Sequence, residues 1–141
     1  RRFVQVGLRG PPSGEQDFAF PQAHGIRAID IEEVARVGIP AVIEEIRQVV
    51  GGGAAYLTFD IDAVDPAFAP GTGTPEVGGL TSREAQHLVR GLAGLSLAGC
   101  DVVEVSPPFD GPGAITSLLA ANLLFEMLCV MAVSPTRRES A

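Results

Sequence analysis

Two aspartates two residues apart are the strongest candidates for chemistry in this sequence. Asp60 and Asp62 follow residues 54–59 (AAYLTF), an apolar run typical of a buried parallel strand. In extended backbone such side chains share a face, so two like charges this close require a cation. Carboxylate oxygens favour Mg²⁺, Ca²⁺ or Mn²⁺ over Zn²⁺. The spacing equally fits an aspartate that only caps the turn after the strand.

Glu104 is the third candidate carboxylate. It lies in residues 101–105 (DVVEV), which predict a second strand, and a buried carboxylate there needs a partner that supplies charge or hydrogen-bond donors. A cationic substrate group, a metal ion or an arginine of the same chain would each serve, and the arginine is the commonest arrangement. Glu126, in the last apolar segment, has the same alternatives, with a salt bridge favoured.

The other reactive residue types lack a catalytic spacing. His24 and His87 show no metal-ligand spacing, and Glu84 is expected to cap a helix. The sequence has no Lys and no G-x-S-x-G motif, which argues against P-loop, Schiff-base and serine-hydrolase chemistry. Cys100 and Cys129 stand in apolar surroundings, which predicts buried thiols in a reducing compartment.

Strands and helices are predicted to alternate along the chain, and this pattern is typical of a parallel α/β architecture. Open parallel sheets bind ligands at the carboxyl ends of their strands, where Asp60 and Asp62 fall. The expected elements are strands at 3–8, 54–59 and 101–105, a connection over 9–25, helices beginning near Asp30–Glu33, Pro40 and Thr81–Glu84, and an apolar helix after Gly113.

Composition narrows the class of protein. The 141 residues are 46% hydrophobic and 19% charged, as in one soluble globular unit, and the net charge of −7 argues against nucleic acid as a partner. Residues 114–133 approach the length of a membrane span, but Asn122 and Glu126 interrupt them, so we expect a core helix and no membrane. The reducing compartment indicated by the two cysteines predicts the cytoplasm or an organelle matrix. The start Arg1-Arg2-Phe3, without an initiator Met or a signal or transit pattern, predicts a piece of something longer.

Three motifs resemble the ureohydrolase family of arginases and agmatinases. They are YLTFDIDAVDPAFAPGTGTPEVGGLTSRE (56–84), DVVEVSPPFD (101–110) and AANLLFEMLC (120–129). The resemblance implies a three-layer α/β/α fold with a mainly parallel sheet, a dinuclear manganese site and a homo-oligomer. It implies that Asp60 and Asp62 are metal ligands, that Glu104 holds the substrate guanidinium, and that Thr74 lies in the nearby active-site loop. Asp65 matches a structural position.

Within that family, APGTGTPE and VEVSPP resemble the agmatinase branch, which implies hydrolysis of agmatine to putrescine and urea, a step of polyamine biosynthesis. The alternative is a guanidinobutyrase-type hydrolase of guanidino acids. Both candidate substrates are small molecules that carry a cationic guanidino group. A metal pair would lower the pKa of a water molecule and so supply hydroxide for attack on the guanidinium carbon.

The family's remaining metal ligands lie in GGDH and DAHxD motifs, and neither motif occurs here. We therefore expect residues 1–141 to be the carboxyl-terminal portion of a ureohydrolase domain without its upstream half, and to be inactive alone. A hypothesis of another class is a truncated, non-catalytic subunit that associates with full-length subunits.

Overall fold

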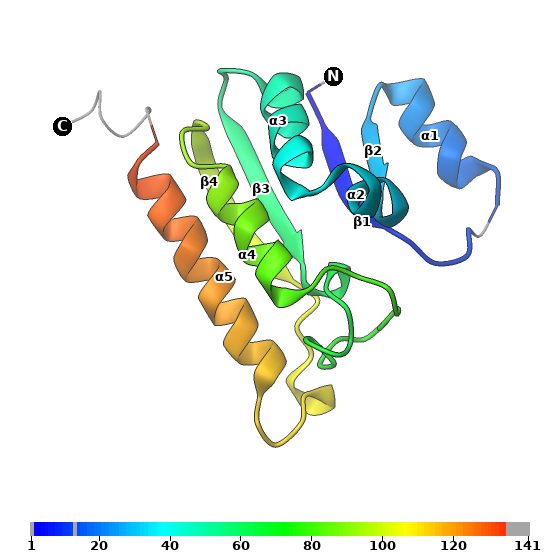
Figure 1. Cartoon of the computed structure of the whole chain (residues 1–141), viewed down its shortest axis with the longest axis vertical. Helices are drawn as coiled ribbons and strands as arrows, with labels where there is room; N and C mark the ends of the chain where they lie inside the picture. Colours follow the sequence, from blue (N-terminus) through cyan, green and yellow to red (C-terminus); the bar gives the residue numbers. More distant parts are fainter. Residues whose placement is uncertain (1, 13, 135–141) are drawn as a thin grey trace.

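The chain builds two pairs of parallel strands and packs helices against them (Figure 1). The computed structural model describes residues 2–12 and 14–134. Their elements are, in chain order, β1 (Val4–Leu8), α1 (Gln16–His24), β2 (Arg27–Asp30), α2 (Ile31–Val37), α3 (Ile39–Val50), β3 (Ala55–Asp60), the 3₁₀ turn η1 (Ile61–Ala63), α4 (Ser82–Gly91), β4 (Leu97–Val103), the 3₁₀ turn η2 (Pro107–Phe109) and α5 (Ile115–Ala132).

Strand β1 pairs with β2 and strand β3 with β4, in both cases in parallel. The register of the second pair places Asp60 beside Val103, the residue that precedes Glu104. Because parallel strands end at the same edge, the loops that follow β3 and β4 meet there. The predicted parallel α/β architecture is confirmed.

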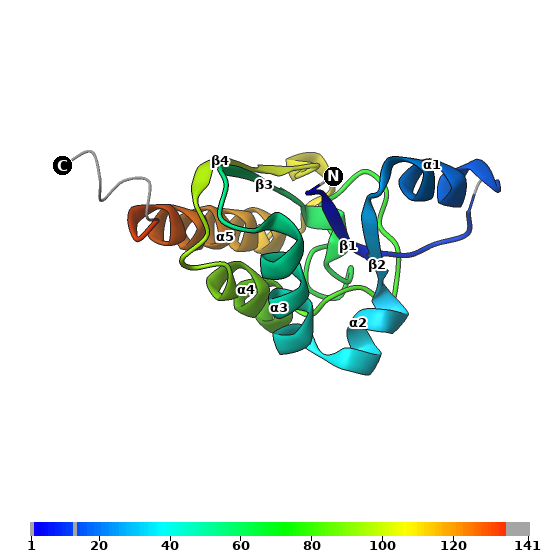
Figure 2. The same ribbon diagram turned by 90° about the horizontal axis from the view of Figure 1, so that it is seen from above.

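Helices α3, α4 and α5 lie on one side of β3 and β4, as the view from above shows (Figure 2). Leu57 and Phe59 of β3 point into this helical layer, and Leu123 and Met127 of α5 are fully buried in it. The opposite face of β3 is open, and Tyr56 there is 65% exposed. The prediction of a buried strand is therefore wrong for that face, because no element of the described residues covers it.

The predicted helix starts at Asp30, Pro40 and Thr81 are confirmed. The side chain of Asp30 accepts a hydrogen bond from the backbone N–H of Glu33 at 2.7 Å, and Pro40 lies in the first turn of α3. The Thr81 hydroxyl and the Glu84 carboxylate each accept a hydrogen bond from the other residue's backbone N–H, which completes a capping box. Glu84 is thus the capping residue that its spacing predicts.

The connection expected over residues 9–25 instead contains helix α1, and the short apolar run after it forms β2. Pro21 lies inside α1, where it cannot donate a backbone hydrogen bond, and this hides the helix from a pattern-based prediction. Strand β4 begins earlier than predicted, at Leu97, and ends at Val103 rather than at residue 105. Glu104 consequently lies just outside the strand.

Among the described residues, α5 is the one helix long and apolar enough to cross a membrane. It packs against α4 and β4, and Glu126 forms an ion pair with Arg90 of α4 at 2.5 Å, which confirms the salt bridge favoured for that carboxylate. The other side of α5 is open: Leu118, Phe125 and Leu128 are each more than 60% exposed. The helix is therefore half core and half uncovered apolar surface in this chain.

Candidate functional site

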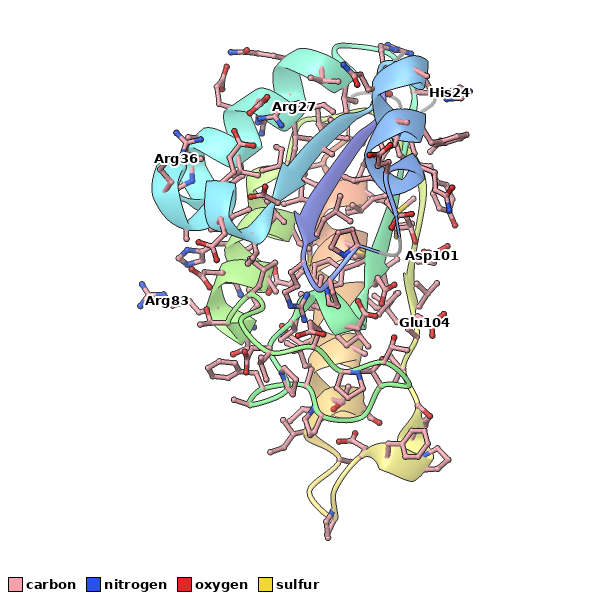
Figure 3. All side chains as sticks on the ribbon, turned by 90° about the vertical axis from the view of Figure 1, so that its right-hand side faces the viewer. His24, Arg27, Arg36, Arg83, Asp101 and Glu104 are labelled. Carbon is pink, nitrogen blue, oxygen red and sulfur yellow. The ribbon has the colours of Figure 1, made fainter. Side chains whose placement is uncertain are left out.

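Asp60, Asp62, Thr74 and Glu104 meet at the edge where β3 and β4 end. Asp60 is the last residue of β3, Asp62 lies in η1, and Glu104 follows β4. In Figure 3, Glu104 lies beyond Asp101 towards the carboxyl end of β4. The sequence thus identified residues that the fold brings together from three separate segments.

Asp60 and Asp62 do not share an extended strand face, because the backbone tightens into a 3₁₀ turn at Ile61. An Asp60 carboxylate oxygen accepts a hydrogen bond from the backbone N–H of Asp62 at 3.1 Å. The turn-capping interpretation of Asp60 is therefore confirmed. The expectation that both aspartates stand on extended backbone is wrong, although their carboxylates still lie close together.

Negative charge nevertheless accumulates around Asp60. Burial raises the pKa of Asp60, and the neighbouring carboxylates of Asp62 and Glu104 raise it further, against the opposing effect of the Asp62 backbone N–H. A raised pKa is expected where carboxylates lie close together without a compensating cation. A divalent cation held by Asp60 and Asp62 would reduce this repulsion.

Thr74 contacts this group directly. Its hydroxyl donates a hydrogen bond to a carboxylate oxygen of Asp62 at 3.1 Å. The Thr74 loop, residues 70–76, therefore orients one of the two candidate metal ligands. That contact is consistent with the position near the active site that the motif implies for Thr74.

Glu104 is exposed rather than buried, and it forms no ion pair with any described residue. The prediction of a buried carboxylate is wrong because Glu104 lies beyond the end of β4, where no described element covers it. Its backbone has φ 61°, in the left-handed region that few residues with a side chain adopt. An exposed carboxylate without an arginine partner is available to a cationic ligand.

Asp65 ties together the two ends of the long loop after β3. Its carboxylate accepts hydrogen bonds from the backbone N–H groups of Ala67, Gly78 and Gly79 at 2.8, 2.7 and 3.2 Å. These contacts lower the pKa of Asp65, with Ala67 making the largest contribution. The carboxylate thus has the structural role that its motif position implies.

Arg9 is the residue that reasoning from the sequence missed. From the loop after β1, its guanidinium donates hydrogen bonds to the backbone carbonyls of Asp62 and Glu76 at 2.5 and 2.6 Å. It therefore fixes both sides of the candidate site from a distant part of the chain. A cation immediately after a strand is a weak signal of such a role, since its carbonyl partners leave no mark in the sequence.

The remaining candidate residues lie elsewhere. His24 lies far from Glu104 in Figure 3, and its ring contacts Phe20 of its own helix. His87 is exposed on α4. Both cysteines are free, but Cys129 is exposed and Cys100 is only partly buried. The prediction of two buried thiols is wrong because the face of α5 that carries Cys129 is uncovered.

The donors present suit a metal ion, but they are few. The part of the chain that the structure describes contains no group of three or more His, Cys, Asp or Glu side chains able to hold one. Asp60 and Asp62 provide hard oxygen ligands of the kind that Mn²⁺ and Mg²⁺ accept. These residues are therefore ligands of the right kind for one side of a metal centre.

Comparison with known proteins finds proteins that are similar to this chain in sequence. Guanidinopropionase of Pseudomonas aeruginosa is 56% identical over 136 residues, which are 96% of this chain and 42% of that protein. Guanidinobutyrase of the same organism is 53% identical over 130 residues, 92% of this chain and 40% of that protein. The chain thus spans about two fifths of the length of these relatives.

Among solved structures, a hypothetical agmatinase from Burkholderia thailandensis superimposes with a TM-score of 0.80 at 46% identity, over 92% of this chain and 38% of that one. The model of the arginase family matches residues 1–129, from before β1 into α5. The matched region contains both strand pairs and all four candidate site residues. The chain belongs to the arginase family.

Proposed function

We propose that this chain is the carboxyl-terminal portion of a metal-dependent enzyme that hydrolyses a guanidino compound to urea and an amine. The observation that carries the proposal is the convergence of Asp60, Asp62, Thr74 and Glu104 at the edge where β3 and β4 end. The names of the relatives support the reaction class.

Each residue has a defined task in this proposal. Glu104 accepts two parallel N–H hydrogen bonds from the planar guanidinium, which fixes the position of the carbon to be attacked. Asp60 and Asp62 hold manganese, and Thr74 keeps the Asp62 carboxylate in one orientation. The metal, when bound as a pair, supplies hydroxide at neutral pH.

The substrate is either agmatine, which the motifs favour, or a guanidino acid. The names of the two Pseudomonas relatives support a guanidino acid. The two substrates differ at the end distant from the guanidinium, where one carries an ammonium and the other a carboxylate. Initial rates of the complete protein on agmatine, 3-guanidinopropionate and 4-guanidinobutyrate test this choice, and a preference for agmatine would exclude the guanidino-acid assignment.

We further propose that the complete protein is a homo-oligomer of the cytoplasm or an organelle matrix. The acidic composition supports neither nucleic acid nor an anionic membrane as a partner. The exposed side of α5, with Leu118, Phe125 and Leu128, supports contact with another protein surface.

Substitutions in the complete protein test the assigned roles. Asp60→Asn and Asp62→Asn should each lower bound manganese and turnover severely, because a carboxamide lacks the charge that balances the cation. Glu104→Gln should keep the metal and weaken both substrate capture and turnover. Asp101→Asn serves as the control, because Asp101 is a nearby carboxylate hydrogen-bonded to Tyr56 at 2.7 Å.

Metal content by atomic spectroscopy and urea release by colorimetry separate the outcomes. Near-normal manganese in both Asp60→Asn and Asp62→Asn would leave only the turn-capping role. Loss of metal from Glu104→Gln would contradict a role limited to substrate binding.

A further inference from the structure

The backbone at Glu104 is held in an unfavourable conformation. With φ 61°, Glu104 is one of two non-glycine residues at positive φ among those described, the other being Ala114. A glutamate gains nothing locally from this conformation, because its Cβ crowds the following carbonyl oxygen. The surrounding structure must therefore hold it there.

Thr72 supplies that restraint. Its hydroxyl donates a hydrogen bond to the backbone carbonyl of Glu104 at 3.0 Å, and its backbone forms an antiparallel bridge with Val105. The backbone N–H of Ser106 donates to the carbonyl of Gly71 at 2.8 Å. Residues 71–72 thus hold the chain immediately after the point where it turns, from the Glu104 carbonyl to Ser106.

Thr72 is itself held in place by burial and by the contacts of its neighbour Gly71. The residue is 3% exposed, and the backbone N–H of the adjacent Gly71 donates to the hydroxyl of Thr116 at 2.7 Å. The backbone N–H of Thr116 in turn donates to the carboxylate of Asp110 at 3.1 Å. A Cβ at Gly71 would lie 2.8 Å from the Cβ of Asp110, so only glycine permits this close approach. The restraint on Glu104 therefore rests on the start of α5.

We propose that Thr72 is a positioning residue that locks Glu104 in its left-handed conformation and thereby aims the carboxylate at the substrate guanidinium. The inference rests on the proposed function, to which it adds a residue that touches neither metal nor substrate. Without the hydroxyl, the residue at 104 relaxes towards negative φ, and the carboxylate swings away from Asp60. Substrate capture then weakens while Asp60 and Asp62 stay in place.

The test uses the complete protein with three substitutions. Thr72→Val has nearly the same shape but lacks the hydroxyl, and Thr72→Ser keeps it. Thr81→Val is the matched control, because it removes a threonine hydroxyl from the α4 cap, away from Glu104. Steady-state kinetics with the guanidino substrate and manganese content are measured for each.

Thr72→Val should raise KM about ten-fold or more with manganese content unchanged, because a small misplacement of a binding group has a large kinetic effect. Thr72→Ser should stay within about two-fold of the wild type, since it retains the donor. Thr81→Val should lower the thermal midpoint and leave KM unchanged.

An unchanged KM in Thr72→Val, in a wild type that is active, would overturn the inference and leave the proposed function standing. A wild type that hydrolyses no guanidino compound would overturn the proposed function itself. If Thr72→Val does not fold, Thr72→Ala replaces it with the same expectation. Failure of both to fold would assign Thr72 to the core alone and overturn the positioning role.

Discussion

The guanidinium of Arg9 donates a hydrogen bond to the backbone carbonyl of Asp62 at 2.5 Å, although the two residues are 53 positions apart in the chain. The same Nη2 atom donates to the carbonyl of Glu76 at 2.6 Å. One planar cation thus joins the end of β1 to both arms of the loop that follows β3. The candidate site depends on this contact between the two strand pairs.

Arg9→Ala should therefore destabilise the complete protein by about 2 kcal/mol, because hydrogen bonds from a charged donor to half-buried carbonyls are lost together. It should also weaken manganese binding, since the turn that carries Asp62 loses its anchor. Urea denaturation and metal titration measure the two effects.

Arg9→Lys should recover less than half of the lost stability, because an ammonium cannot match the planar fork that reaches both carbonyls. Arg83→Ala, on the exposed side of α4, is the control for a lost surface arginine. Full stability in Arg9→Ala would show that the loop holds its shape without this contact.

The strain at Glu104 gives a second prediction. Glu104→Gly and Glu104→Ala both remove the carboxylate, but only glycine adopts φ 61° without steric cost. We expect Glu104→Gly to be more stable than Glu104→Ala by about 1 kcal/mol in chemical denaturation. Both variants should lose substrate binding equally. Equal stabilities would mean that the backbone relaxes at this position at no cost.

The carboxylate of Asp65 should make the stability of the folded protein depend on pH. Its pKa in the folded protein lies below the usual value of 3.8, so the unfolded chain binds a proton more readily than the folded one. The stabilisation by Asp65 is therefore complete above about pH 4 and is lost as the pH falls through the lowered pKa. Asp65→Asn should be less stable at neutral pH, and its stability should fall less steeply as the pH is lowered.

Thermal denaturation between pH 2 and pH 7 measures the effect of Asp65. Asp30→Asn is a suitable comparison, because Asp30 also accepts a backbone N–H but belongs to the cap of α2. If stability falls as steeply with falling pH in Asp65→Asn as in the wild type, the pH dependence belongs to other carboxylates.

The open side of α5 predicts self-association of the purified 141-residue chain. Leu118, Phe125 and Leu128 are 69%, 62% and 61% exposed and lie on one helical stripe. Phe125→Glu combined with Leu128→Glu should weaken association about ten-fold or more in sedimentation velocity, because charge opposes burial of that stripe.

Ala41→Glu combined with Gln48→Glu adds the same charge to exposed positions of α3 and is the control. Association that persists in the α5 variant and disappears in the α3 variant would place the contact surface on α3 instead.

The sequence predicted well those features that depend on local hydrogen bonding and side-chain type. The cap at Asp30 and the capping box of Thr81 and Glu84 are formed within four residues, so their pattern is visible in the chain. Asp60 and Asp62 were found as a pair because they are only two residues apart in sequence. The extended backbone expected across the pair was mistaken, because the strand ends at Asp60 and a 3₁₀ turn follows.

Features set by distant contacts could not be predicted in this way. Glu104 appeared buried among valines, yet it is exposed beyond the end of β4, and its left-handed backbone depends on the distant contact with Thr72. Arg9 gave no signal because it binds carbonyl oxygens, which every residue carries. The exposure of Tyr56 depends on which layers surround the sheet, and the pattern of a single strand does not contain that information.

Because the strands are parallel, the loops before them and the loops after them lie at opposite edges of the sheet. The sequences of these two sets of loops can therefore evolve at different rates. The residues proposed for chemistry lie after β3 and β4, whereas the turn at residues 51–53 precedes β3 at the opposite end. A side chain added at Gly52 would meet no atom within 4 Å. Position 52, unlike its two glycine neighbours, can therefore accept drift in sequence or a fluorescent label without disturbing the candidate site.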